Sequence, residues 1–170
     1  NGIGEIIVRG DNVMLGYYKN ELATEEVMNN GYFHTGDLGY LDNEGFLYIT
    51  GRKKNVIVTK NGKNIFPEEL ETYLNRSRYV SECMAYGVEA DDGDTLVAMQ
   101  VVPDLAEIES EFGKDFGDEN IKKLIDEEIL KVNHVLQNYK RISKVIVRYE
   151  EFAKTTTKKI KRHIEINKGQ

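Results

Sequence analysis

Tryptophan is absent from this 170-residue sequence, and cysteine and proline are scarce. The single cysteine, Cys83, excludes an internal disulfide and a cysteine-based metal cluster, so a reducing, cytoplasmic setting is the expected one. No apolar run approaches the roughly 20 residues of a membrane-spanning helix. The N-terminus lacks the basic and apolar regions of a signal peptide, and it lacks an initial Met, which fits a chain cut from a longer one.

Several common catalytic and binding motifs are also missing. The sequence has no Gly-x-x-x-x-Gly-Lys-Ser/Thr loop, no Gly-x-Gly-x-x-Gly and no Gly-x-Ser-x-Gly. The three histidines, His34, His134 and His163, lack the spacing of metal ligands. These absences argue against a P-loop nucleoside triphosphatase, a dinucleotide-binding domain, a serine hydrolase with a nucleophile elbow and a histidine metal site.

Charge is distributed unevenly around a net value of −6. Residues 104–128 hold ten acidic and three basic side chains, whereas residues 151–170 hold six Lys or Arg and two Glu. A solvated helix face is the favoured interpretation of the basic tail, and a lysine that meets a phosphate is a second one. We expect no nucleic-acid partner, and peripheral contact with an acidic membrane surface stays open.

Turn signals and apolar spacing predict the order of elements. We expect strands at 5–8, 45–50, 55–58, 63–65, 79–88, 96–102 and 144–149, and helices at 24–29, from Pro67, from Asp118 and at 160–166. Asn61-Gly62 favours a tight hairpin, and the acidic segment 106–117 reads as a long exposed loop. The expected class is α+β: helices packed on a roughly three-stranded sheet plus a β-hairpin, preceded by a different, strand-rich unit.

The apolar faces of two expected helices are defined by their spacing. Leu70, Tyr73 and Leu74 form the buried face of the helix that Pro67 opens. The long helix carries an apolar stripe at intervals of three or four residues, formed by Ile121, Ile125, Ile129, Val132 and Leu136.

The segment Thr35-Gly36-Asp37 is a candidate ligand-binding motif. Glycine lets the backbone come close to a ligand, and a carboxylate can accept both hydrogen bonds that a ribose diol offers. Taken alone, these three residues more simply indicate an aspartate that closes a turn.

Read together, the motifs resemble the adenylate-forming superfamily, which includes acyl-CoA synthetases, luciferases and the adenylation domains of peptide synthetases. The resemblance rests on segments 32–37, 51–54 and 61–71, on 4–10 and 14–18 before them, and on 154–162 near the end. It covers nearly the whole chain in the family's order. Bacterial long-chain fatty-acid–CoA ligases are the most similar members.

The resemblance implies a domain organisation and a reaction. Residues 1–52 would be the last strands of the N-terminal adenylation domain, and residues 53–170 a mobile C-terminal lid that packs against it. Such enzymes convert ATP, a fatty acid and CoA into acyl-CoA, AMP and pyrophosphate through an acyl-adenylate. The phosphate loop, the Mg²⁺ ligand and the acyl pocket would lie upstream, so we expect this chain alone to be inactive.

The resemblance also assigns roles to individual residues. Asp37 would bind the ribose hydroxyls of ATP and AMP, with Arg52 assisting near the ribose and phosphate. Lys54 falls on the hinge, where the backbone must change conformation. Gly62 corresponds to a glycine beside the pantetheine tunnel of CoA, and Lys159 to the adenylation lysine that neutralises charge as the acyl-phosphate bond forms.

The basic loop departs from the family pattern Pro-Lys-Thr-x-x-Gly-Lys-x-x-Arg at two positions. Ala153 replaces the proline and Lys158 replaces the glycine. Two adjacent lysines therefore compete for the catalytic role, and the spacing to Arg162 favours Lys159.

Two alternatives remain open. The substrate could differ, as in an aryl- or short-chain-acyl–CoA ligase, or in an amino-acid adenylation domain that feeds a carrier protein. The chain could instead be an independent, non-catalytic binding module that uses its basic tail.

Overall fold

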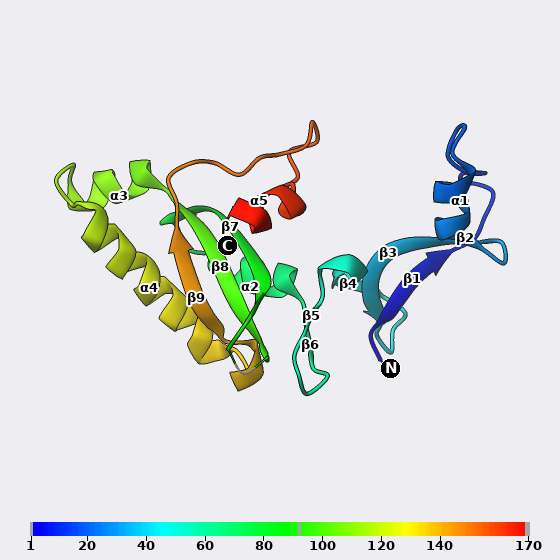
Figure 1. The fold of residues 1–170 in the computed structure, drawn as a ribbon, viewed down its shortest axis with the longest axis horizontal. Helices are drawn as coiled ribbons and strands as arrows, with labels where there is room; N and C mark the ends of the chain where they lie inside the picture. The colour runs from blue at the N-terminus through cyan, green and yellow to red at the C-terminus, as the bar shows by residue number, and fades with distance from the viewer. Residues whose placement is uncertain (1, 92, 169–170) are drawn as a thin grey trace. The chain divides into compact units, whose positions relative to one another are not determined.

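The computed structural model describes residues 2–91 and 93–168. The chain divides into two compact units, unit 1 at Asn1–Val56 and unit 2 at Ile57–Gln170 (Figure 1). The division follows Val56, whereas the boundary expected from the sequence follows Arg52.

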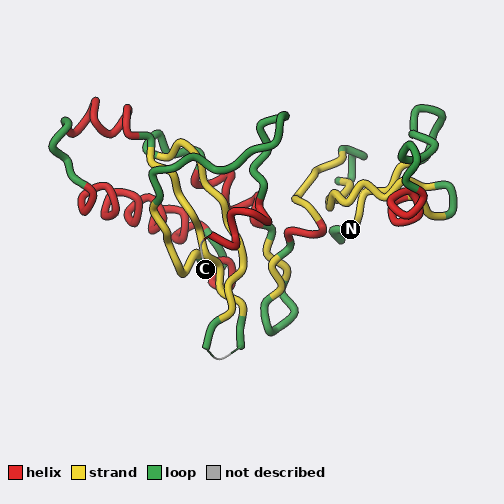
Figure 2. Tube along the Cα trace, turned by 45° about the horizontal axis from the view of Figure 1, so that its top comes forward, coloured by secondary structure: helices red, strands yellow, loops and turns green. Residues whose placement is uncertain are grey.

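Unit 1 is an antiparallel sheet built around one long strand. Strand β3 (Tyr32–Leu41) pairs antiparallel with β1 (Gly4–Val8), β2 (Met28–Asn29) and β4 (Leu47–Arg52) (Figure 2). Helix α1 (Glu21–Val27) precedes β2. The structure thus places the motif Thr35-Gly36-Asp37 inside a strand that sequence patterning did not predict.

Unit 1 has no hydrophobic core of its own within the described residues. Every buried apolar side chain in the described part of the chain lies at or after Ile57. Large apolar side chains of the β3–β4 hairpin are exposed instead, among them Leu41, Phe46, Leu47 and Ile49. Tyr40 and Tyr48 stack on each other with their ring centroids 5.2 Å apart. Backbone pairing therefore supplies most of the order in this unit.

Unit 2 contains a mixed three-stranded sheet and a separate hairpin. Strand β8 (Thr95–Pro103) lies between β7 (Val80–Glu89), to which it is antiparallel, and β9 (Ile142–Val147), to which it is parallel. The parallel pair requires a crossover, which α3 (Leu105–Phe112) and α4 (Asp118–Val135) provide. The hairpin consists of β5 (Ile57–Val58) and β6 (Asn64–Ile65). The expected α+β class is confirmed.

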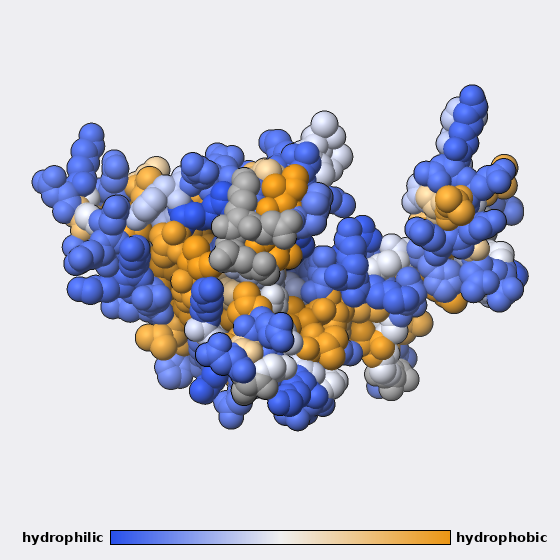
Figure 3. Space-filling view, viewed as in Figure 1, coloured by the Kyte–Doolittle hydropathy of each residue, from blue (hydrophilic) through white to orange (hydrophobic). Residues whose placement is uncertain are grey.

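Both faces of this sheet are covered, as the alternation along the strands requires. One face packs with α2 (Pro67–Leu74) and α4, and its strand residues include Cys83, Ala85, Val97, Met99 and Val101. The opposite face packs against Phe152 and the C-terminal segment, and its strand residues are Met84, Tyr86, Ala98 and Val102. In Figure 3, apolar residues gather over this sheet between α4 and α5 (Arg162–Lys168).

The predicted helical faces are confirmed. Leu70 and Leu74 are fully buried, Tyr73 packs partly buried against the same core, and all five residues of the α4 stripe are buried. Pro67 occupies the first turn of α2 as expected. Two short 3₁₀ turns, η1 (Lys53–Asn55) and η2 (Asn138–Lys140), complete the elements. None of the helices in the described residues is both long and apolar enough to cross a membrane.

Two sequence expectations about helices are wrong. The acidic segment expected to be a loop contains α3, because the Asp104 carboxylate caps its N-terminus by accepting a hydrogen bond from Glu107 N (3.1 Å) and because Ile108 is buried in the core. The helix expected at 24–29 begins earlier, since Asn20 rather than Thr24 provides the cap. Thr24 lies within that helix and donates to Asn20 O (2.8 Å).

Candidate functional site

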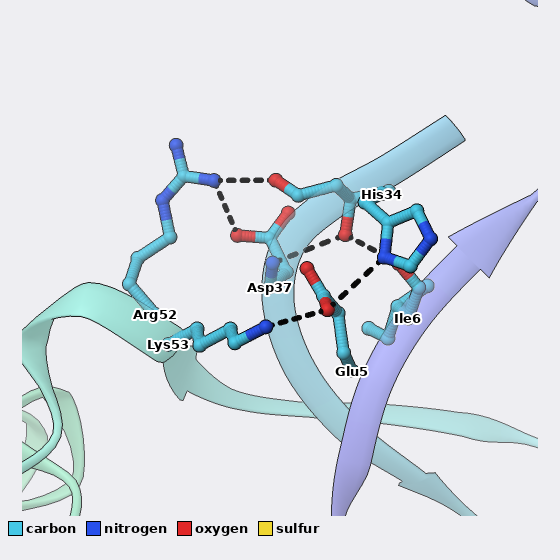
Figure 4. Close-up of polar contacts among 7 residues, drawn as sticks. Glu5, Ile6, His34, Asp37, Arg52 and Lys53 are labelled. Atoms are coloured by element: carbon cyan, nitrogen blue, oxygen red, sulfur yellow. Dashed lines mark hydrogen bonds and ion pairs between the residues drawn. The ribbon is translucent and has the colours of Figure 1, made fainter. Parts of the chain in front are cut away.

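Asp37 and Arg52 face each other across the β3–β4 pair. Arg52 Nη1 donates to Asp37 Oδ1 (2.9 Å) and to Thr35 O (3.0 Å) (Figure 4). Both side chains are partly exposed. Asp37 Oδ2 accepts no side-chain hydrogen bond from the residues that the structure describes, so it remains available to a diol. The structure therefore brings together the two residues expected to bind the ribose.

The backbone around Asp37 is shaped by its neighbours. Gly36 has φ +71°, a conformation that side-chain-bearing residues rarely adopt. The Thr35 hydroxyl donates to Ile6 O (2.8 Å) and accepts from Asp37 N (3.0 Å), which fixes this kink between β1 and β3. The simpler interpretation, an aspartate that closes a turn, is wrong because Asp37 lies within a paired strand.

Glu5 forms a second polar cluster in unit 1 that sequence reasoning missed. Its Oε2 accepts from Lys53 Nζ (3.0 Å) and lies 3.2 Å from His34 Nδ1 (Figure 4). The hydrogen bond from Lys53, and after it the one from His34, lowers the pKa of the Glu5 carboxyl. Glu5 is 29 positions from His34 and 48 from Lys53, so no local motif signals the cluster.

Lys54 lies in the η1 turn, directly before the division between the units. Its side chain is exposed. Lys54 makes no side-chain hydrogen bond or ion pair with the described residues, whereas Lys53 beside it pairs with Glu5 and Asn55 is half-buried.

Gly62 lies in the loop of the β5–β6 hairpin. Thr59 N donates to Lys63 O (3.0 Å) and Gly62 N to Thr59 O (2.8 Å). Gly62 has φ +70°, and a Cβ added there would meet nothing within 4 Å. The hairpin is confirmed, although Gly62 alone, and not Asn61, takes the positive φ. Open space at Gly62 leaves its surface accessible to a ligand.

Lys159 ends a loop that starts at Thr155. Thr155 N donates to Lys159 O (2.8 Å), and Lys158 N donates to Thr155 O (2.9 Å). Lys158 has φ +61°, which is uncommon for a residue with a side chain. Lys159 is exposed, and its ammonium group contacts no residue in the described part of the chain through a hydrogen bond or ion pair.

The basic loop is fastened to the sheet on both sides. Before it, Lys154 forms ion pairs with Glu82 and with Glu151 (3.3 Å). After it, Arg162 Nη2 donates to Glu71 Oε2 (2.6 Å) and Arg162 Nη1 to Ala85 O (3.0 Å). Lys154 and Arg162 thus serve structural contacts, whereas Lys159 between them does not.

Glu71 links three elements around this loop. Its Oε1 accepts from Ala85 N (2.7 Å) in β7, while its Oε2 binds Arg162 at the start of α5. Burial raises the pKa of the Glu71 carboxyl, and Arg162 opposes that effect. The resemblance used Arg162 only to set the register, so its partner on α2 is a finding of the structure.

A second buried ion pair holds α5 against the sheet. Arg148 Nη1 binds Glu165 and also Gln100 Oε1 (3.1 Å), while Glu165 Oε1 accepts from Ala153 N (3.0 Å). Glu165 is completely buried. This network fixes the C-terminal helix and both ends of the segment that leads to the basic loop.

Among the described residues, no group of three or more His, Cys, Asp or Glu is placed to hold a metal ion. Cys83 is buried in the core, as expected for a small apolar residue. Burial, and then the charge of Glu71, raise the pKa of the Cys83 thiol far above its ordinary value. Cys83 is therefore unsuited to act as a nucleophile.

Comparisons with known proteins agree on one family. The model of the AMP-binding enzyme C-terminal domain matches residues 54–168. The long-chain-fatty-acid–CoA ligase FadD15 of Mycobacterium tuberculosis is 50% identical over 84 residues, which is 49% of this chain and 14% of that protein. The 2-succinylbenzoate–CoA ligase of Bacillus cereus is 44% identical over 108 residues, which is 64% of this chain and 22% of that protein.

A solved structure extends the similarity to nearly the whole chain. The o-succinylbenzoate CoA synthetase of Bacillus subtilis, in complex with its acyl-adenylate intermediate, superposes with a TM-score of 0.72 at 31% identity. The match covers 95% of this chain and 30% of that one. The same enzyme has also been solved with AMP, and with ATP and magnesium ion. The chain thus spans less than a third of the length of these relatives.

Proposed function

The chain belongs to the family of AMP-binding enzyme C-terminal domains, and we propose that it is the C-terminal part of an AMP-forming acyl-CoA ligase. The protein joins a carboxylic acid to AMP from ATP, releases pyrophosphate, and transfers the acyl group to CoA. The names of the relatives support this reaction class, since both groups are CoA ligases.

The observation that carries the proposal is the state of Lys159. The structure pairs Lys154 and Arg162, on the two sides of the loop, with carboxylates. The nearer Lys158 and Lys161 make no such pair among the described residues, and Lys158 takes the positive-φ position that glycine has in the family loop. Lys159 instead lies exposed at the end of a turn that is fastened on both sides. An exposed ammonium group on such a loop is suited to neutralise charge on the α-phosphate and the carboxylate as they join.

Asp37 and Arg52 are proposed to hold the nucleotide. The free oxygen of Asp37 accepts hydrogen bonds from the ribose hydroxyls, and Arg52 fixes the other oxygen while offering its remaining donors to the ribose and phosphate. ATP supplies the activated phosphate of the first step. By resemblance to the family, magnesium is bound by groups outside the residues described above.

Gly62 is proposed to serve the second step. A glycine at this exposed hairpin loop leaves room for the pantetheine arm of CoA to pass close to the backbone. Lys54 is proposed as the hinge residue, because its side chain is exposed and has no partner among the described residues that would resist a change of φ and ψ between the two steps.

A fatty acid is the proposed substrate, since the FadD15 match has the higher identity. The alternative substrate is 2-succinylbenzoate. It is favoured by the 2-succinylbenzoate–CoA ligases, whose alignments with this chain are longer than that of FadD15. The residues that contact the acyl group in either case are proposed to lie in the larger adenylation domain.

The exposed strands of unit 1 support the proposal that residues 1–52 form the last strands of the adenylation domain. A sheet with large exposed apolar side chains and no core of its own is typical of a segment that packs against further protein. We also propose a cytoplasmic location, because the free thiol of Cys83 suits a reducing compartment.

The test is pyrophosphate release by the full-length protein with ATP and Mg²⁺. The panel comprises fatty acids of several lengths, 2-succinylbenzoate, a short-chain acid and a set of amino acids. Release with fatty acids, followed by acyl-CoA formation, is expected. If only 2-succinylbenzoate supports pyrophosphate release, 2-succinylbenzoate rather than a fatty acid is the substrate. If none of the acids supports release, the proposed reaction class is wrong.

We propose further that residues 1–170 alone do not catalyse adenylation. Catalysis needs groups held together around ATP, and the phosphate-binding loop of such enzymes is not among these residues. Pyrophosphate release by the 170-residue chain would contradict this proposal.

A further inference from the structure

The position of Lys159 depends on its backbone alone. Its side chain has no partner in the described residues, so nothing orients the ammonium group directly. The hydrogen bonds between Thr155 and Lys159 are internal to the turn and do not connect it to the rest of unit 2. The attachments outside the turn therefore determine where Lys159 lies.

On the C-terminal side, Ile160 packs against the apolar cluster on the sheet, and a polar attachment that centres on Glu71 follows two residues later. Arg162, three residues after Lys159, extends to the open edge of β7, where its guanidinium binds Ala85 O and the Glu71 carboxylate. The same carboxylate accepts from Ala85 N. One side chain from α2 thus fixes both the edge of the sheet and the first residue of α5.

Stability alone does not account for a charged pair at this place. The Glu71 and Arg162 side chains are only 12% and 21% exposed, so both lose hydration on folding. The desolvation penalty offsets most of the attraction in such buried pairs. A pair of apolar residues at the same place often stabilises the folded protein at least as much. What this ion pair and its three hydrogen bonds (2.6, 2.7 and 3.0 Å) do supply is a defined geometry.

We propose that Glu71 is a positioning residue for the adenylation step: through Arg162 it holds the loop of Lys159 in its productive geometry. This inference rests on the function proposed above. Glu71 itself touches no substrate, and it acts on the first half-reaction only because Lys159 does.

The test uses Glu71→Gln in the full-length ligase. The amide keeps an acceptor for Ala85 N but loses the charge that binds Arg162. The rate constant of pyrophosphate release should fall about ten- to a hundredfold, as misplacement of a catalytic group by about 1 Å does. The KM for ATP and the rate of thioester formation from supplied acyl-AMP should stay near those of the parent protein.

Glu69→Gln is the matched control. Glu69 lies on the same helix and pairs with Lys140 (2.7 Å), away from the basic loop. The same substitution there removes an ion pair of α2 but should leave both half-reactions unchanged. Arg162→Lys keeps the charge opposite Glu71 while losing the forked contact, so an intermediate loss of adenylation rate is expected.

The outcomes separate this inference from the proposed function. If Lys159→Ala slows pyrophosphate release and Glu71→Gln does not, positioning by Glu71 is wrong and the function stands. Equal slowing of both half-reactions by Glu71→Gln assigns it a merely structural role and also overturns the inference. If Lys159→Ala has no effect while the parent protein releases pyrophosphate, the role of Lys159 and the positioning inference are both wrong, and the reaction class stands. If the parent protein releases none with any acid, the proposed function is wrong. Should Glu71→Gln fail to fold, Arg162→Lys decides between the same outcomes.

Discussion

Gly62 and Lys158 occupy the same position in two loops that share three hydrogen bonds. In each loop a threonine N–H donates to the carbonyl of a lysine four residues on, and the threonine carbonyl accepts from the residue before that lysine. The threonine hydroxyl also accepts from the lysine N–H, at 3.1 Å in both. The φ angles are +70° for Gly62 and +61° for Lys158. Lys158 therefore stands where a glycine fits, which supports Lys159 as the acting lysine.

Replacing Lys158 by glycine should stabilise the protein. A left-handed conformation costs a residue with a side chain about 1–2 kcal/mol. Glycine relieves that strain and loses about 0.5–1 kcal/mol through the greater freedom of its unfolded chain. The free energy of unfolding, measured by urea denaturation, should rise by about 0.5–1 kcal/mol.

Thr156→Gly is the control for Lys158→Gly. Thr156 is exposed in the same loop and has no positive φ, so glycine there brings only the entropic cost. Its free energy of unfolding should fall. A change of the same sign for the two variants would show that Lys158 is not strained.

Gly62→Leu should block thioester formation and spare adenylation, because its side chain obstructs the path of CoA. Gly62→Ala is the matched variant, since both residues are strained at φ +70° and differ in size. Both should lose about 0.5–1 kcal/mol of folding stability, the cost of the left-handed conformation less the entropic gain from replacing glycine. Thioester formation should be at least about tenfold slower for leucine than for alanine, which is about 1.4 kcal/mol in the barrier. Equal rates for the two would contradict the role of Gly62 beside CoA.

Cys83 should resist alkylation in the folded protein. Burial raises the pKa of its thiol, so at pH 8 the reactive thiolate is scarce and shielded. Iodoacetamide followed by mass spectrometry should label the chain only in denaturant. Rapid labelling without denaturant would show that the core around Cys83 opens readily.

The same raised pKa makes folding stability depend on pH. The folded state holds the proton more tightly, so this contribution is complete below the unfolded thiol's pKa of about 8.5 and declines as the pH rises above it. The free energy of unfolding should fall between pH 8 and pH 10. Cys83→Ala should show a smaller fall, and an equal fall would assign the effect to other groups.

A shortened chain that starts at Lys53 should fold without unit 1. Every buried apolar side chain of the described residues lies within it, including the α4 stripe and the fully buried Leu70 and Leu74. Thermal unfolding followed by circular dichroism should be cooperative, with a midpoint near that of the 170-residue chain. A broad, non-cooperative transition would show that unit 2 depends on the strands before it.

Local signals were sufficient to predict much of unit 2. Pro67 at a helix start, the glycine at the hairpin loop and the α4 stripe are each encoded within a few residues. Helix α3 was not predicted because its acidic composition resembles that of a solvated loop, although Leu105, Ile108 and Phe112 have helical spacing. Strand β3 was not predicted because its glycines resemble turn residues in the sequence. Gly39 is needed inside the strand, since a Cβ there would lie 2.4 Å from Tyr48 O.

In the candidate site, too, local motifs were predictable and contacts between distant segments were not. Asp37, Arg52, Gly62 and Lys159 were identified through short motifs, and their roles remain predictions from resemblance. The partners that hold them were not predictable, because ion pairs between distant segments leave no periodic pattern. Glu71 and Arg162 are 91 positions apart, and the pairing of Glu5 with Lys53 spans 48.

The two half-reactions of Lys159→Ala and Lys158→Ala in the full-length protein test the central claim most directly. Lys159→Ala should slow pyrophosphate release about 10²–10³-fold, through loss of about 3–4 kcal/mol of transition-state stabilisation. It should leave thioester formation from supplied acyl-AMP largely intact. Lys158→Ala should slow adenylation by about tenfold at most. A severe loss for Lys158→Ala would shift the catalytic assignment by one residue, and equal slowing of both steps by Lys159→Ala would contradict the account.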